Sequence, residues 1–370
     1  MDSNHSPQRT FVTSYGVCSP VGFNQELLSK VLDEDISLKP LSIDNSILEQ
    51  EIKKLNLEKV NPRRMDRLSK IAIFSAASCF NMANVKVDET NQNDIGGVFC
   101  TTFGPIQSSR DFVTSGFKNG IAAASPLLFP FTVGNAASGL ITIHLGIKGF
   151  NTTISGYSPI CYAFDTIQSH KAKAIIAGGF EELTAEMIQA FKTREVVKDG
   201  KRIRSEIESL SEGSAMVFIE SEDFARSNNS NILFEICGYG LHCNVQNEEF
   251  SIDCFGEISP ETIFDSMKMA LDRAGLTKDN ISAIVSLSRS DSSQTESELV
   301  ALNGIWENSL PPIYYVKKVV SETFGANDSI ALIYGYKKAL SLKAESNESI
   351  YVLINSYHIG GNCFSTIIRV

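Results

Sequence analysis

The order of apolar segments occurs twice along the chain, and this repetition constrains the fold more than any other feature. A stripe of apolar residues at helical spacing precedes a continuous apolar strand at 68–82 and 95–100, and the same pair recurs at 262–274 and 284–287. Helices that alternate with wholly apolar strands are typical of α/β folds whose strands are buried on both faces. The sequence therefore predicts an α/β layered fold with interior strands.

A second set of segments repeats in the same order. A β-branched strand, a helix and a buried strand follow one another twice, with the strands at 151–155 and 174–177 and again at 313–316 and 351–354. An internal duplication of one α/β unit explains both sets. The polar run 226–230, which lies between the two copies, has the composition of a linker. We therefore predict two duplicated halves, 1–225 and 226–370.

One glycine pair follows the last predicted strand of each half. These are Gly178-Gly179 and Gly360-Gly361. Glycine accepts conformations and close backbone approaches that a side chain prevents. We expect both pairs to end their strands in turns at which another backbone segment comes near.

The charge of the chain limits its partners. The formal net charge is -10, with 43% hydrophobic and 21% charged residues, which is ordinary for a globular protein. An acidic surface repels phosphate backbones and anionic lipid headgroups, so we expect no nucleic acid and no membrane as partner. The polar N-terminus lacks the pattern of a signal peptide, and no stretch is long and apolar enough to span a bilayer. We therefore expect a cytoplasmic protein.

The eight cysteines form no C-x-x-C pair, and most lie in apolar segments. This spacing favours reduced, core-filling thiols over a disulfide framework or a zinc site. No glycine-rich phosphate loop follows any predicted strand, so no nucleotide or flavin motif is visible. We expect neither a metal nor a cofactor.

Short motifs in a fixed order carry a resemblance to a known family. The chain resembles the β-ketoacyl synthases, whose fold consists of two thiolase-type halves. The resemblance implies a thiolase-like, five-layered αβαβα sandwich over almost the whole chain. The segments that resemble the family's motifs are 9–22, 63–67, 125–126, 134–139, 177–179, 211–215 and 355–362.

The resemblance also points to three positions where the family has its catalytic groups. A condensing ketosynthase uses a cysteine thiolate to take the acyl chain and two histidines to polarise the malonyl thioester. Here Ser158 stands in place of the cysteine, Leu287 in place of the first histidine and Glu322 in place of the second. A serine hydroxyl is a weak nucleophile without a base, leucine donates no proton, and a carboxylate repels a developing enolate. The resemblance therefore implies that this chain does not condense.

Other chemistry at this site stays open. Cys161 lies nearby, but its apolar surroundings favour a buried structural thiol over a nucleophile. Ser158 and His358 could serve a hydrolase or acyltransferase, which would require a Ser–His hydrogen bond and a third orienting group. A third possibility, decarboxylation of malonyl units, needs donors that Leu287 and Glu322 do not supply.

Lys317 and Glu298 stand where the resemblance places a lysine and a glutamate near the catalytic centre. They are interpreted either as a remnant of catalytic electrostatics or as a partly buried ion pair. Because removal of one member of such a pair leaves an uncompensated charge, the structural interpretation is favoured once the histidines are gone.

A ketosynthase fold without its catalytic groups suggests a binding role. The resemblance implies a chain-length factor, the ketosynthase-β subunit of type II polyketide and aryl-polyene systems. Such a subunit forms a heterodimer with an active ketosynthase, which also receives the acyl carrier protein, and shapes the acyl tunnel. We expect strand 149–157 to pair with the partner and the helix after Gly104-Pro105 to face its tunnel. Candidate tunnel residues, which ordinary interface packing would equally explain, are Ser109, Phe112, Val113 and Gly116.

Overall fold

The computed structural model describes residues 8–24, 41–55, 57, 59–83, 85–192, 195–198, 201–204, 210–243, 258–288, 293–307, 309–344, 346, 348–358 and 360–370. The strands are β1 (Thr10–Ser19), β2 (Gly22–Phe23), β3 (Ile95–Cys100), β4 (Asn151–Ile154), β5 (Ala174–Glu181), β6 (Glu195–Lys198), β7 (Lys201–Arg204), β8 (Gly213–Ser221), β9 (Phe234–Cys243), β10 (Ile281–Ser286), β11 (Ile313–Tyr315), β12 (Tyr351–Tyr357) and β13 (Asn362–Arg369).

The α-helices are α2 (Asn45–Lys53), α3 (Arg67–Ala83), α4 (Ile106–Asn119), α5 (Ala136–Leu145), α6 (Pro159–Gln168), α7 (Ala185–Lys192), α8 (Glu222–Ser227), α9 (Pro260–Ala274), α10 (Ser293–Trp306), α11 (Lys317–Val320) and α12 (Asn327–Lys343). Short 3-10 turns are η1 (Pro62–Arg64), η2 (Ile121–Ala123), η3 (Phe129–Phe131), η4 (Lys278–Asn280) and η5 (Phe324–Ala326).

The strands pair in the same order in both halves of the chain. In the first half, β3 lies parallel between β4 and β5, β8 is antiparallel to β5, and β1 is antiparallel to β8. In the second half, β10 lies parallel between β11 and β12, followed by antiparallel β13 and β9. A short β1–β9 pairing joins the two half-sheets. This equal order confirms the internal duplication, whereas the limits 1–225 and 226–370 stay a prediction.

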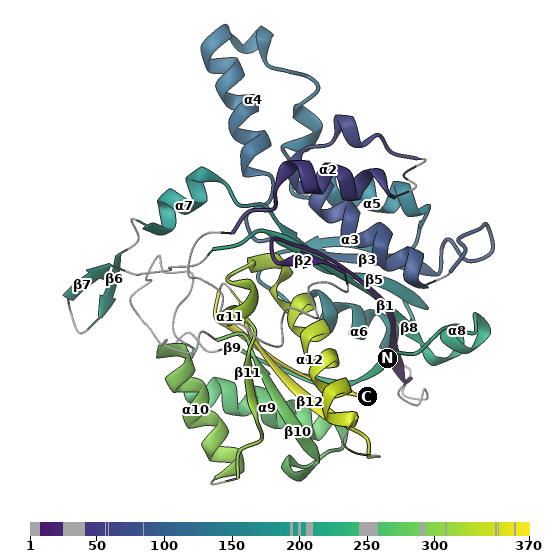
Figure 1. Cartoon of the computed structure of the whole chain (residues 1–370), viewed down its shortest axis with the longest axis vertical. Coiled ribbons are helices and arrows are strands. Elements are labelled where there is room, and N and C mark those ends of the chain that lie inside the picture. Colours follow the sequence, from purple (N-terminus) through teal and green to yellow (C-terminus); the bar gives the residue numbers. More distant parts are fainter. Residues whose placement is uncertain are drawn as a thin grey trace.

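Helices and half-sheets alternate as five layers (Figure 1). Helices α3 and α5 cover the outer face of the first half-sheet, and α9 and α10 cover the outer face of the second. Helices α6 and α12 lie between the half-sheets, where α12 contacts β5 and β8 of the first and β10 and β12 of the second. The expected αβαβα arrangement is confirmed. The largest core cluster surrounds these two middle helices.

The prediction that Gly178-Gly179 ends its strand was wrong. Strand β5 continues through both glycines to Glu181, because β8 pairs with it along its full length. A Cβ on Gly178 would lie 2.1 Å from the Ala215 carbonyl oxygen, and one on Gly179 would lie 1.7 Å from the Gly325 carbonyl oxygen. The glycines therefore serve the close backbone approach that the sequence suggested, but within a strand.

The second glycine pair does form a turn, since Gly360 and Gly361 have φ angles of 93° and 83°. This turn joins β12, which extends three residues beyond the predicted Ile354, to β13. Strands β8 and β13 were not predicted from the sequence. Both are antiparallel strands inserted between the predicted ones, so the pairing order became visible only in the structure.

The described cysteines are free thiols, and most are buried, as the composition predicted. Cys254 lies outside the described residues. Within the described part of the chain, no helix is long and apolar enough to cross a membrane, and no cluster of three metal-ligating side chains occurs.

Candidate functional site

Ser158 lies in the turn between strand β4 and helix α6, at the N-terminus of the helix. Strand β4 ends at Ile154, Gly156 turns the chain with a φ of 68°, and Ser158 caps the N-terminus of α6. Its hydroxyl oxygen accepts a hydrogen bond from the Cys161 backbone N–H at 3.4 Å. Such a cap satisfies one of the helix's orphan donors. Ser158 therefore has a structural task, and only 2% of the residue is exposed.

The Asp328 carboxylate occupies the position beside Ser158. His358 Nε2 lies 3.0 Å and 3.1 Å from the two Asp328 oxygens, and the hydroxyls of Ser158 and Ser356 also hydrogen-bond to this carboxylate. Burial acts to raise the pKa of Asp328, but the His358 charge and these hydrogen bonds together lower it. Asp328 thus remains an anion in a closed polar cluster. Asp328 was not among the predicted site residues, although an aspartate inside the apolar stripe of α12 is a visible signal in the sequence.

The cavity at this cluster is too small for an acyl group. Its volume is about 10 Å³, and it is lined by Ser158, Asp328, Ser356 and Thr366 together with the side chains of Ile160, Leu332 and Ile354. A space of this size holds one water molecule at most. Substrate therefore has no room beside the Ser158 hydroxyl.

The arrangement does not favour a serine hydrolase or acyltransferase. In a catalytic triad the imidazole accepts the serine proton, and the carboxylate orients the imidazole from its far side. Here the Asp328 carboxylate binds both Ser158 and His358 Nε2, so it takes the place that the triad gives to the imidazole. Within the described residues, Ser158 therefore has no imidazole in position to accept its proton, and its basic neighbour is a carboxylate whose lowered pKa makes it a weak base.

Leu287 and Glu322, the two positions where the resemblance places histidines, both make structural contacts. Leu287 follows β10, is buried in the central core, and donates its N–H to the Asn355 carbonyl at 3.0 Å. Glu322 accepts from Lys317 Nζ at 2.6 Å and from the Phe324 N–H at 2.9 Å. Burial acts to raise the pKa of Glu322, but the Lys317 charge and these hydrogen bonds lower it.

The interpretation of Lys317 and Glu298 as an ion pair was wrong, because Lys317 pairs with Glu322 instead. Glu298, on α10, accepts hydrogen bonds from Ser286, from Ser288 at 2.7 Å and from Asn355 Nδ2 at 2.9 Å. The sequence did not show which of the two buried carboxylates, Glu298 or Glu322, faces Lys317.

Cys161 is an inert thiol. It is buried in α6, and its sulfur lies 3.5 Å from the Thr366 hydroxyl oxygen. Burial raises the pKa of its thiol to about 12. Because the thiolate is the nucleophilic form, this environment agrees with the structural role that its sequence context predicted.

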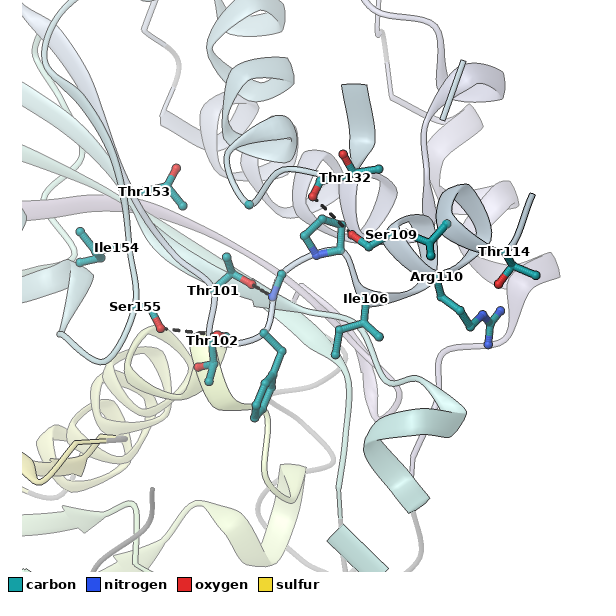
Figure 2. A pocket seen from close by; sticks show the side chains of 15 residues that line it. Thr101, Thr102, Ile106, Ser109, Arg110, Thr114, Thr132, Thr153, Ile154 and Ser155 are labelled. Carbon is teal, nitrogen blue, oxygen red and sulfur yellow. Dashed lines mark hydrogen bonds between the residues drawn. The ribbon is translucent and has the colours of Figure 1, made fainter. Parts of the chain in front are cut away.

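A much larger pocket opens on the other side of the β4 elbow. Its volume is about 750 Å³, within the range of small-molecule sites. Residues 101–106 form its floor, α4 forms one wall, and the end of β4 forms the other; Figure 2 shows Ser109, Arg110 and Thr114 facing Thr153, Ile154 and Ser155 across Thr101 and Thr102. The two walls come from segments that lie about 40 residues apart in the sequence, 109–114 and 153–155.

The structure divides the four tunnel candidates into two pairs. Ser109 and Val113 line this pocket. Phe112 instead packs on Phe129, with ring centroids 5.6 Å apart, and a Cβ on Gly116 would meet Ala124 at 3.7 Å. Phe112 and Gly116 therefore do not line this pocket, because their side of α4 packs on the returning segment 121–131, and their place in a tunnel stays a prediction.

Helix α4 projects from the molecule (Figure 1), and several large hydrophobic side chains on it and near it are exposed. These side chains lie on α4, its return segment and α5, with Phe117 and Ile121 about nine-tenths exposed at 87% and 91%. Contiguous exposed apolar side chains are typical of protein interfaces. We call this the α4 surface; its members are Val113, Phe117, Ile121, Leu127, Phe129, Val133 and Ile143.

The free edge of the main sheet lies beside the same pocket. Strand β4 is the last strand of the sheet, and within the described residues no strand pairs with its outer edge. Its Thr153 and Ile154 line the pocket. An unpaired strand edge is a template for pairing with another chain. The pocket therefore opens between an unpaired strand and the α4 surface.

The sequence of the chain is similar to those of known proteins. Residues 47–225 match the family model described as "Beta-ketoacyl synthase, N-terminal domain". This match covers just under half of the chain. The ketosynthase-like chain is 25% identical over 268 residues to "3-oxoacyl-[acyl-carrier-protein] synthase 2" of Synechocystis sp., a match that covers 65% of this chain and 64% of that protein. The match thus spans just under two thirds of the relative's length.

Solved structures show the same fold. "The ishigamide ketosynthase/chain length factor" superposes with a TM-score of 0.78 at 17% identity, covering 98% of this chain and 99% of that one. A second structure, of a type II PKS acyl-carrier protein in complex with its ketosynthase (AntDE:AntF), has a TM-score of 0.76 at 16% identity, covering 98% and 99%. The thiolase-like ketosynthase fold that the motifs implied is therefore confirmed.

Proposed function

We propose that this chain is a non-condensing ketosynthase-like subunit, a chain-length factor, that forms a heterodimer with an active β-ketoacyl synthase. Its contribution is to stabilise that partner and to form one wall of the acyl tunnel. The observation that carries the proposal is the state of the Ser158 site. At this site the Ser158 hydroxyl binds the Asp328 carboxylate instead of an imidazole, and a cavity of about 10 Å³ leaves no space for a condensation.

The surface around the larger pocket supports the choice of partner. A second ketosynthase-type chain that paired with the outer edge of β4 would also cover the α4 surface and roof the pocket of about 750 Å³. The pocket would then become an enclosed tunnel whose near wall includes Ser109 and Val113. Burial of exposed apolar side chains supplies most of the free energy of such an association.

The charge of the chain suggests where a carrier protein would bind. A net charge of -10 disfavours docking of an acidic carrier on this subunit, so the active partner is expected to receive it. The known proteins of similar fold include a ketosynthase/chain length factor and a type II PKS ketosynthase. We infer a place in polyketide or aryl-polyene synthesis, in the cytoplasm, without a metal or cofactor.

The test is reconstitution with the ketosynthase encoded beside this chain. The two subunits are co-expressed and co-purified, and condensation of carrier-bound malonyl units is measured with each subunit alone and with both. We expect activity only with both subunits. Activity should survive Ser158→Ala here and disappear when the partner's nucleophile is replaced.

Two outcomes would overturn the proposal. One is failure of the two subunits to associate while the partner condenses fully by itself. The other is an acyl adduct or thioester turnover with this chain alone, which would revive Ser158 and His358 as an active site.

A further inference from the structure

A buried carboxylate lies directly beneath the floor of the larger pocket. Glu181, the last residue of β5, is fully buried. Its carboxylate accepts the N–H groups of Thr102 at 2.6 Å, Phe103 at 3.0 Å and Gly104 at 3.1 Å, and the Thr101 hydroxyl at 3.0 Å. Three successive backbone donors that converge on one carboxylate fix the backbone of the loop that carries them. The pose of the pocket floor therefore depends on Glu181.

The same carboxylate binds a loop from the other half of the chain. The Gly325 N–H donates to Glu181 at 3.3 Å. A Cβ on Gly325 would lie 2.8 Å from Thr101 Cα, so the two loops touch backbone to backbone. The Phe103 ring, which lines the pocket, meets the Phe324 ring edge-on at 5.0 Å between centroids. Glu181 thus joins the pocket floor to the loop that carries Glu322.

That second loop is held in a strained conformation. Ser321 has φ 61° and ψ -162°, and Phe324 has φ 47°, values that residues with side chains rarely adopt. Such residues persist only where their surroundings hold them in place. Here the restraints include the Lys317–Glu322 pair and the bond from Gly325 to the Glu181 carboxylate.

Glu182, the next residue, anchors the wall of the pocket. Its carboxylate accepts the Gln107 N–H at 2.9 Å, in the first turn of α4. Pro105, at the N-cap of this helix, supplies no side-chain cap. Adjacent glutamates thus hold the floor and the wall, but only Glu181 also reaches the second half of the chain.

We propose that Glu181 is the positioning residue of the pocket, and that through it the 321–325 loop sets the depth of the tunnel floor. The coupling is a property of this chain alone. Its consequence for product length rests on the proposed function. Nothing in this role requires Glu181 to contact the acyl chain, because it acts through the backbone of residues 101–104.

The first test is hydrogen exchange of the complete chain, followed by mass spectrometry, for Glu181→Gln and Glu181→Ala. Glutamine keeps one acceptor oxygen, so we expect amides 102–104 and 325 to lose protection together, on the order of tenfold for Gln and more for Ala. Glu220→Gln is the matched control. Glu220 is an equally buried glutamate on β8 whose carboxylate accepts from Ser230, away from the pocket.

The second test is product length in the reconstituted heterodimer. We expect Glu181→Gln to change the distribution of chain lengths while the affinity between the subunits stays within twofold, a separation that general destabilisation would not give. If Glu181→Ala does not fold, Thr101→Val removes one donor from the same carboxylate and should loosen 102–104 in the same direction.

The inference and the proposed function fail in different ways. Loss of protection in only one of the two segments, or in neither, would overturn the coupling even if the heterodimer is active. Unchanged product length in an intact complex would overturn the positioning role. Absence of any complex would overturn the proposed function and leave the exchange result standing.

Discussion

The Asp328 carboxylate decides, at the scale of a single residue, how the cluster around Ser158 is organised. It binds His358 and the Ser158 hydroxyl beside a cavity of only about 10 Å³. Replacing it by asparagine keeps the shape but removes the charge opposite His358. Because the variant removes a buried acceptor to which His358, Ser158 and Ser356 hydrogen-bond, we expect Asp328→Asn to lower the free energy of unfolding by about 1–3 kcal/mol, measured by chemical denaturation.

The pH dependence of this pair has a definite sign. The folded-state pKa of Asp328 is lowered, so its stabilisation is present above the carboxyl's ordinary value of 3.8 and is lost as the pH falls below it. The variant should lose that acid-dependent component. Asp94→Asn is the control, since Asp94 pairs with Lys173 on the surface and should change stability by about 0.5 kcal/mol or less. An equal loss in both variants would contradict a buried, charged Asp328.

Ser158 gives a second prediction at this scale. Restoring a thiol by Ser158→Cys should not restore acylation, because the side chain stays buried beside an anion and has no histidine partner at Leu287 or Glu322. Mass spectrometry after incubation with an acyl-loaded carrier should show no adduct at residue 158. An adduct there would mean that the site opens in solution and that the closed cluster is not its only state.

At the scale of one element, helix α4 separates residues that fill the pocket from residues that pack behind it. Val113 lines the pocket, whereas Gly116 faces Ala124. In the reconstituted heterodimer we expect Val113→Phe to shorten the product, because the larger ring occupies tunnel volume. Gly116→Ala adds a methyl group at an ordinary contact distance of 3.7 Å and should leave product length unchanged. Shortening by Gly116→Ala alone would reverse this assignment of the helix faces.

The elements themselves were largely predictable, and the pocket was not. Helical periodicity identified α3, α9 and α12, and apolar runs identified β3 and β10, because each pattern is local. The split of α4 into two functional faces was missed, since it depends on where the returning segment with Phe129 packs. Asp328 and Glu181 were missed for the same reason: their partners are far away in sequence, and a lone carboxylate does not indicate which donors will surround it.

At the scale of the whole molecule, buried glutamates make stability depend on pH in the opposite direction from Asp328. Burial raises the pKa of Glu181 and of Glu182 to about 7, and nearby Asp66 and Glu212 add repulsion at Glu182. The folded chain therefore binds more protons than the unfolded chain between the ordinary value of 4.5 and about 7, so these groups reduce stability as the pH rises through that window.

Glu182 is the better place to test this dependence, because its second carboxylate oxygen has no hydrogen-bond partner within the described structure. We expect Glu182→Gln to raise the free energy of unfolding by about 1–3 kcal/mol near pH 7.5 relative to the parent, and by much less near pH 5. Urea titrations at both pH values provide the measurement. A stabilisation of the same size at both would show that charge burial is not the cause.

The last prediction concerns assembly, and it follows from the alternation of β4. The Phe150 carbonyl accepts the Gly97 N–H of β3, and the Ile154 carbonyl accepts the N–H of Thr101, the residue after β3. In a parallel ladder Thr152 therefore faces β3 as well, while Asn151 directs its backbone outward. Proline at position 151 would remove an outward N–H and leave the β3 ladder intact. We expect Asn151→Pro to weaken heterodimer formation at least about tenfold while the isolated subunit keeps its melting temperature.

Thr152→Pro, which breaks the ladder within the chain, should instead destabilise the subunit itself. Equal affinity for Asn151→Pro and the parent, measured by analytical ultracentrifugation, would mean that the partner does not extend the sheet, and the α4 surface would then have to account for the association without the strand.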